Sequence, residues 1–281
     1  MRIAIPSYAC DCHLHVYDSR FPANAPVPEG AEASHYQEKR AELGLTRAVV
    51  VQPRPYGTDS TVILRAIAIL GRRHTRGVAV LPPDISDQEL QRLHDGGIRG
   101  ARFSLYSKTN AAVSFNDIEK TADRVKAMGW HLQLHWTADQ IVDHRQLLSR
   151  LPTPLVFDHM ARLPVSSRRH PAFDVVSGLA KDGLAWIKLS GPYLESNLSL
   201  EDGFADIEPI ARGWIDNAAD RLVWGSDWPH VDRPGGLDDE KLLALLIAWT
   251  RSEACLRKVL VENPVELYDF EPLPLTCEHR Q

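Results

Sequence analysis

The segment Asp11-Cys-His-Leu-His15 places two histidines two residues apart near the start of the chain. On an extended strand this spacing turns both imidazoles to the same side. Such a pair can polarise a carbonyl group directly, or it can hold a divalent ion that activates water. A carboxylate that could act with them as a general base, Asp227, occurs much later, in Trp224-Gly-Ser-Asp-Trp-Pro-His230. Histidines and a carboxylate held together at one site can carry out acid–base or metal-assisted chemistry.

Other polar side chains stand near the ends of short apolar runs. Arg102 has the planar guanidinium that can form two parallel hydrogen bonds to a carboxylate, so it is the candidate substrate anchor. His159 is a candidate to polarise the carbonyl together with the histidine pair, and His135 is a candidate for substrate binding. The remaining candidates of this kind are Gln52, Ser104 and Ser190.

Eight runs of strand-like composition recur along the chain, with helix-like stretches between them. The runs are Cys10–Val16, Arg47–Gln52, Gly77–Leu81, Ile98–Ser104, His131–Trp136, Leu155–Met160, Ala185–Ser190 and Leu222–Asp227. Helices are predicted at Asp59–Arg73, Phe115–Gly129, Asp139–Arg150 and Asp238–Thr250. Eight repeats over about 250 residues are typical of a single-domain (β/α)8 TIM barrel. We therefore expect one barrel over residues 1–270 and a disordered C-terminal tail, 271–281.

In such a barrel, only side chains that point inward at the C-terminal ends of the strands can share one site. On the first strand, alternation predicts an inward side made of Asp11, His13 and His15. It predicts that the helices face Cys10, Cys12, Leu14 and Val16. The same alternation puts a polar candidate at or near the inward C-terminal end of every other strand except the third. A ring of polar groups without a function would cost about several kcal/mol for each buried charge, so the ring indicates a site.

Three further candidates lie just beyond these runs. Arg162 and Lys108 could bind a second carboxylate, although a solvated loop charge is the competing interpretation for each. His230 is expected at the rim of the site, and its alternative role is to pack the turn that carries Asp227. The proline-rich segment Tyr17 to Ser34 is expected as a loop over the end of the first strand.

The composition excludes several classes of protein. The chain has 281 residues, 44% hydrophobic and 25% charged, and its net charge of −5 comes without a basic stripe, so nucleic acid is not an expected partner. No apolar run approaches the roughly 20 residues of a membrane span, and no signal-peptide pattern is found, so we expect a cytoplasmic protein without a membrane partner. Free thiols are expected for Cys10, Cys12, Cys255 and Cys277. The oligomeric state stays open between monomer and homo-oligomer.

The His-x-His segment and the Trp224 to His230 segment resemble the amidohydrolase superfamily (amidohydrolase family 2), whose members face such a pair with an Asp on the last strand. More narrowly, the chain resembles the 2-pyrone-4,6-dicarboxylate lactonase group, which also includes sugar-lactone hydrolases. This resemblance is carried by Val51-Gln-Pro, Gly57-Thr-Asp59, Gly100-Ala-Arg-Phe103, Asp158-His-Met-Ala-Arg162, Lys188-Leu-Ser190 and Asn263-Pro-Val-Glu-Leu-Tyr268. These segments run in order over nearly the whole chain.

The resemblance implies a hydrolase that opens the ring of a small carboxylated lactone. Asp227 would be the general base on water, and the histidines and Arg102 would hold the carbonyl and carboxylates. Pyrone lactonases of this group work without a bound metal and carry a Tyr where the fifth strand ends here in His135, whereas relatives with histidines at these positions hold a divalent ion. The expectation is therefore either no required metal or one Zn or Mn ion. Its candidate ligands are His13, His15, His135, His159 and Asp227.

Other functions fit the same barrel. A sugar-lactone isomerase would move the acyl group between hydroxyls and release no free acid. A decarboxylase acting on an aromatic acid would release carbon dioxide and depend on a metal. A non-catalytic protein that binds an acid or a sugar agrees less well with the residues, because it would not need a reactive Asp227.

Overall fold

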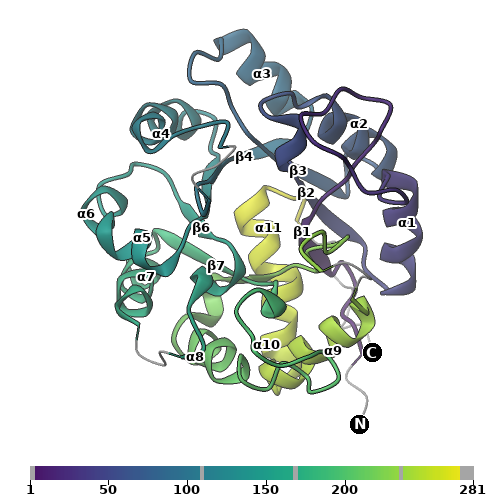
Figure 1. Ribbon diagram of the computed structural model, residues 1–281, viewed down its shortest axis with the longest axis vertical. Helices are drawn as coiled ribbons and strands as arrows, with labels where there is room; N and C mark the ends of the chain where they lie inside the picture. Colours follow the sequence, from purple (N-terminus) through teal and green to yellow (C-terminus); the bar gives the residue numbers. More distant parts are fainter. Residues whose placement is uncertain (1–3, 108–110, 167–169, 234–236, 273–281) are drawn as a thin grey trace, which may run out of the picture.

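The computed structural model describes residues 4–107, 111–166, 170–233 and 237–272. At its centre eight parallel strands form one sheet in the order of the chain (Figure 1). The strands are β1 (Cys10–Leu14), β2 (Arg47–Val51), β3 (Thr75–Ala79), β4 (Ile98–Ser104), β5 (His131–His135), β6 (Leu155–Phe157), β7 (Ala185–Leu189) and β8 (Leu222–Trp224). A bridge between Leu14 and Trp228 joins the two edges and closes the barrel. The predicted single-domain (β/α)8 barrel is confirmed.

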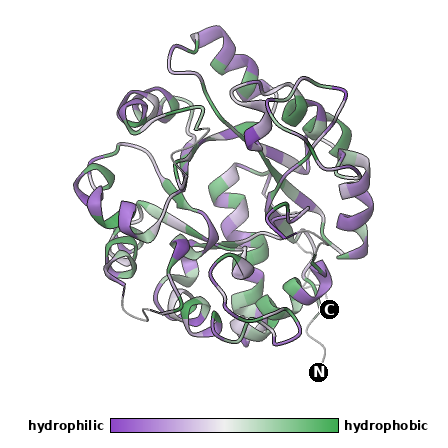
Figure 2. Cartoon of the chain, in the orientation of Figure 1, coloured by the Kyte–Doolittle hydropathy of each residue, from purple (hydrophilic) through white to green (hydrophobic). Residues whose placement is uncertain are grey.

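Helices lie around the barrel, most of them in an outer ring (Figure 1). They are α1 (Ala33–Glu42), α2 (Thr61–Leu70), α3 (Asp87–Asp95), α4 (Ile118–Lys126), α5 (Ala138–Asp143), α6 (Arg145–Leu148), α7 (Pro171–Lys181), α8 (Glu208–Ala218), α9 (Asp239–Thr250), α10 (Glu253–Arg257) and α11 (Asn263–Tyr268). Helices of this ring carry both colours in Figure 2, as amphipathic helices do. The predicted helix Asp139–Arg150 is interrupted at His144, and Phe115–Gly129 begins with a 3₁₀ turn before α4.

The inside of the barrel is closed at its N-terminal end by α11, which lies across the middle of the ring in Figure 1. Tyr268 packs its ring edge-on against His131 at the start of β5. Arg76 at the start of β3 donates to the backbone oxygens of Tyr268 and Asp269. The opposite, C-terminal end of the barrel therefore remains for a site.

The first strand corrects the predicted alternation. The sheet register shifts between Asp11 and Leu14, so an irregularity of the bulge type lies inside β1. The side chains of Cys10 and Cys12 lie inside the barrel, in an apolar cluster that also contains Tyr268 of α11. Asp11 points outward instead, where its carboxylate accepts hydrogen bonds from Tyr36 of α1 and from Ser226. The prediction for these three residues is wrong, because one bulge exchanges the two sides of a strand.

Several smaller expectations can be compared with the described residues. The segment between β1 and α1 contains no helix or strand, as predicted for a long loop. Cys10, Cys12 and Cys255 are free thiols. In the part of the chain that the structure describes, no helix has both the length and the apolar character needed to cross a membrane. Lys108, Cys277 and most of the predicted tail lie outside the described residues.

Candidate active site

His13 and His15 lie where β1 ends, and neighbouring strands hold their Nδ1 atoms. Nδ1 of His15 is 2.8 Å from the backbone oxygen of Val51, the last residue of β2. Nδ1 of His13 is 3.2 Å from Oδ1 of Asp158, which follows β6. The backbone oxygen beside Nδ1 of His15 favours the proton at that nitrogen and leaves Nε2 as a lone pair. Nδ1 of His13 has two neighbours, the Asp158 carboxylate and, at 3.3 Å, Nζ of Lys188. Burial lowers the pKa of His15 to about 3 and lowers that of His13 well below its usual value, so both rings are neutral.

His135 and His159 continue the row of rings. Nδ1 of His135 lies 3.1 Å from Oγ of Ser104, and Nδ1 of His159 lies 3.0 Å from Oγ of Ser190. The ring centroid of His159 is 4.8 Å from that of His13 and 5.1 Å from that of His135. Burial lowers the pKa of both rings well below its usual range. The structure therefore brings together all four predicted histidines, and it uses Ser190 to orient one of them.

Asp227 faces this row from the segment after β8. Its Oδ2 accepts a hydrogen bond of 2.5 Å from the Tyr193 hydroxyl. Burial raises the pKa of Asp227 to about 6, against the opposing effect of the Tyr193 hydrogen bond. Gly225 lets this segment approach β1, since a Cβ there would lie 2.4 Å from Cβ of His13. A carboxyl group with a pKa of about 6 is ionised near neutral pH and can accept a proton from water.

Three donor atoms at the barrel mouth fit one divalent ion. Nε2 of His13 lies 3.3 Å from Nε2 of His15, and Oδ1 of Asp227 lies 3.5 and 3.6 Å from these two nitrogens. Ligands at about 2.05 Å in a tetrahedron are about 3.3 Å apart. Two imidazole nitrogens and a carboxylate in this arrangement can hold a cation between them. A second possible group joins His13 to Asp158 and His159, whereas His135 belongs to neither group among the described residues.

A charged network lies beneath His13. Asp158 is fully buried, and its carboxylate lies 3.4 Å from the Arg102 guanidinium and 3.7 Å from Nζ of Lys188. Nζ of Lys188 also donates to Oε1 of Gln133 and to the backbone oxygen of Cys12. Burial alone would raise the pKa of Asp158, but the nearby cations and the His13 ring hold it well below its ordinary value. Burial lowers the pKa of Lys188 to about 8.

Arg102 is buried at the mouth and has capacity for a further acceptor. Its terminal nitrogens donate to the backbone oxygen of Gln52 and to Asp158, at 3.3 and 3.4 Å. Its Nε is buried and has no hydrogen-bond partner among the described residues. A buried donor without a partner is costly, so this edge of the guanidinium favours an incoming anion.

Arg162 has a different environment at the rim. Its Nε and terminal nitrogen lie 2.7 and 2.6 Å from Oε1 of Glu195. Its guanidinium lies over the Tyr106 ring, with 4.0 Å between Cζ and the ring centroid. Its other terminal nitrogen lies 3.2 Å from Nε2 of His135. Because arginine only donates, Nε2 of His135 accepts there.

Two residues that were predicted for the site form hydrogen bonds with groups outside the row of histidines. The amide of Gln52 donates to the backbone oxygens of Gly57 and Asp59 and accepts from Ser60, so its side chain organises the β2 loop and does not face the histidines. Nε2 of His230 lies 2.8 Å from Asp239, the first residue of α9. This contact agrees with the alternative role of packing the turn. Lys108 lies outside the described residues.

Sequence reasoning missed residues that the geometry places at the centre. In the sequence, Asp158 and Lys188 stand out only within motifs that carry the resemblance. Strand alternation would have predicted that both side chains point into the barrel. Lys188 lies two residues before Ser190 on β7, and Asp158 lies two residues after the inward Val156. No comparable pattern marks Tyr193 or Glu195, because both lie in the irregular segment after β7.

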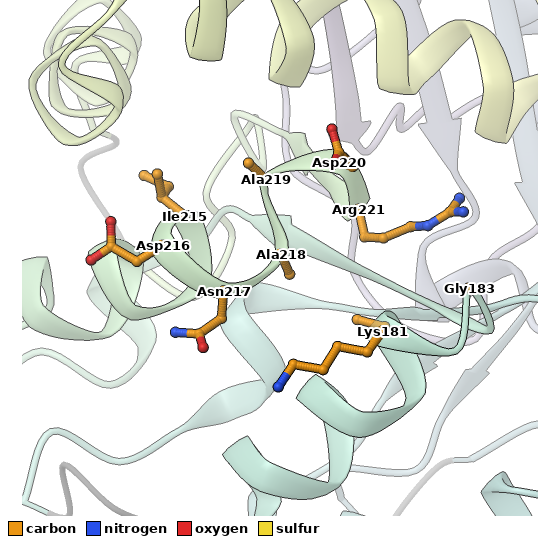
Figure 3. A pocket seen from close by; sticks show the side chains of 10 residues that line it. Lys181, Gly183, Ile215, Asp216, Asn217, Ala218, Ala219, Asp220 and Arg221 are labelled. Atoms are coloured by element: carbon orange, nitrogen blue, oxygen red, sulfur yellow. The ribbon is translucent and has the colours of Figure 1, made fainter.

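A separate hollow of about 430 Å³ lies outside the barrel, among residues of α7, α8 and the turn before β8 (Figure 3). Its polar groups include Asp220 and Arg221, which pair with Lys258 and Glu266. The turn precedes β8, so the hollow belongs to the N-terminal end of that strand. It does not contain any of the histidines or carboxylates of the mouth.

Comparison with known proteins places this geometry in a family. The amidohydrolase family model matches residues 10–270. The chain is 32% identical to a 2-pyrone-4,6-dicarboxylate hydrolase of Comamonas testosteroni, over 94% of this chain and 91% of that protein. It is 26% identical to a D-galactarolactone isomerase of Agrobacterium fabrum, over 97% and 95%. An apo structure from Agrobacterium tumefaciens superposes with a TM-score of 0.87 at 26% identity, covering 96% of this chain and 98% of that one. The chain belongs to the amidohydrolase family of enzymes.

Proposed function

We propose that this enzyme opens the ring of a small carboxylated lactone by attack of water. The observation that carries the proposal is the convergence, at one end of the barrel, of the Asp227 carboxylate with the incompletely paired Arg102 guanidinium. A carboxylate with a pKa near 6 suits a general base, and a buried guanidinium suits a substrate carboxylate. Relatives named for hydrolysis or isomerisation of carboxylated lactones support the same class of substrate.

Asp227 is the proposed general base. It takes a proton from water as the oxygen of that water attacks the lactone carbonyl carbon. The bond between this carbon and the ring oxygen then breaks, and the ring oxygen leaves as a hydroxyl group with the proton that Asp227 took from water. The new carboxylic acid loses its own proton to the solvent. Tyr193 holds Oδ2 of Asp227, which leaves Oδ1 turned toward the histidines.

Arg102 is the proposed anchor for the substrate carboxylate, and Asp158 and Gln52 keep its side chain in place. His159 is proposed to help polarise the carbonyl, and its ring is held by Ser190. A fixed donor at the developing oxyanion commonly contributes about 100- to 1,000-fold in rate.

His13, His15 and Asp227 would hold a divalent ion such as Zn or Mn. When bound, this ion would polarise the carbonyl and lower the pKa of water. Its presence is tested by calorimetric titration of the chelated protein with Zn²⁺, for which we expect one site per chain and at least tenfold weaker binding after His15→Ala. Equal binding by both proteins would exclude this group of ligands.

The isomerase is the second candidate, because one relative carries that name. Purified protein is incubated with carboxylated lactones, and acid release is followed by pH-stat while nuclear magnetic resonance identifies the products. Hydrolysis releases one equivalent of acid for each ring opened. A rearranged lactone without acid release would favour the isomerase, and saturable binding without any product would indicate a non-catalytic protein.

A further inference from the structure

Arg162 and Arg102 are both buried guanidiniums near the row of histidines, and their charges are balanced differently. Arg162 has a carboxylate of its own, Glu195, which contacts both Nε and a terminal nitrogen. The third side of its guanidinium faces His135, and its face covers Tyr106. The side chain of Arg162 is only 5% exposed, whereas that of Glu195 is 25% exposed. Glu195 is therefore the more exposed member of this pair.

Arg102 has no such dedicated carboxylate. Asp158 lies at 3.4 Å from it, but the same carboxylate also lies close to His13 and Lys188. Two cationic side chains thus share one buried carboxylate, and Nε of Arg102 remains without a partner among the described residues. A substrate anion gains a donor at Arg102, while at Arg162 it would meet a charge that is already neutralised.

We propose that Glu195 restricts this site to lactones with a single carboxylate, which binds Arg102, and with neutral hydroxyl groups on the part of the ring that faces Glu195. The proposal deepens the function proposed above and rests on it. A hydroxyl group can donate to Oε2 of Glu195 while Oε1 keeps its pair with Arg162. A second carboxylate would instead face a like charge, or would have to displace Glu195 from Arg162.

The consequence separates this chain from the relative that is named for a dicarboxylate substrate. Removing the charge of Glu195 would leave Arg162 unbalanced and available. The side-chain amide of Gln keeps the shape and one acceptor oxygen, so Glu195→Gln changes the charge with little change in packing.

The test compares kcat/KM for two substrates, D-galactarolactone with one carboxylate and 2-pyrone-4,6-dicarboxylate with two. We expect the wild type to prefer the monocarboxylate by at least tenfold, and we expect Glu195→Gln to shift the ratio by about tenfold toward the dicarboxylate. Glu201→Gln, on the same segment but exposed, is the matched control and should leave the ratio unchanged. Circular dichroism checks that each variant is folded.

A wild type that prefers the dicarboxylate, or an unchanged ratio in Glu195→Gln, would overturn the role of Glu195 while leaving lactone hydrolysis intact. If neither lactone is consumed, the proposed function fails separately. Calorimetric binding of the open-chain mono- and dicarboxylate products still tests the charge preference in that case. Tighter binding of the dicarboxylate by wild type than by Glu195→Gln would then contradict the inference.

Discussion

Single residues set the protonation states at the barrel mouth. The pKa of Asp227 is raised to about 6 by burial, and the Tyr193 hydrogen bond limits this rise. The base is active when ionised, so kcat/KM should fall as the pH decreases through about 6. In Tyr193→Phe the opposing hydrogen bond is lost, so the pKa rises and the acid limb of the profile moves to higher pH. An acid limb that stays in place or moves to lower pH would show that Tyr193 does not lower the pKa of Asp227.

The carboxylate anchor depends on the shape of a side chain as well as on its charge. In Arg102→Lys the positive charge remains, but the planar arrangement of donors is lost. We expect kcat/KM to fall by about 10- to 100-fold, mainly through a higher KM, since the anchor binds the ground state and the transition state alike. Steady-state kinetics on a carboxylated lactone measures this effect. Unchanged kinetics would remove Arg102 from the site.

At the scale of elements, the segment after β6 has an unusual backbone. His159, Met160, Ala161 and Arg162 have consecutive left-handed φ angles between 49° and 61°. Side chains rarely adopt this conformation, at a cost of roughly 1 kcal/mol or more for each residue. The turn places His159 toward His13 and Arg162 toward Glu195. Such local strain is consistent with a functional role for the segment.

The segment after β7 supports this turn through a glycine. Gly191 has a φ of 56°, and a Cβ there would lie 2.7 Å from Nδ1 of His159. Gly191→Ala should therefore displace the His159 ring and lower kcat by about tenfold or more, a figure that follows from its proposed contact with the carbonyl. Gly178→Ala, on the exposed side of α7 with open space around it, is the control and should raise stability slightly. Equal activity of the two variants would contradict the proposed placement of His159.

Periodicity explains both the success and the limits of sequence reasoning for these elements. Apolar runs with helices between them predicted all eight strands, and alternation brought His135 and Asp227 to the end of the barrel that His13 and His15 occupy. His159 reaches the same end through the left-handed turn after β6, because alternation from the inward Val156 points Asp158 inward and not His159. Alternation failed at Asp11, because a bulge depends on how β1 meets its neighbours and leaves no mark in composition. The pairing of Arg162 with Glu195 also could not be predicted, since it joins two irregular segments through the left-handed turn.

At the scale of the whole molecule, helix α11 closes the N-terminal end of the barrel, and Arg76 holds it there. Arg76 is buried and donates to four backbone oxygens, those of Arg72, Thr75, Tyr268 and Asp269. Arg76→Met should lower the free energy of unfolding by about 2 kcal/mol or more, because these carbonyls lose a charged donor. Urea unfolding measures the change. Arg73→Met removes an exposed pair with Glu271 and should change stability by less than about 1 kcal/mol, so an equal effect of both variants would contradict a special role for Arg76.

The proposed mechanism depends on one carboxylate, that of Asp227. Its most direct test is the rate of acid release from a carboxylated lactone by wild type and by Asp227→Asn. Asparagine keeps the shape of the side chain but cannot accept the proton. We predict a folded variant in which kcat/KM is reduced by about 100- to 10,000-fold. Near-normal acid release by Asp227→Asn would contradict the proposed mechanism in its central step.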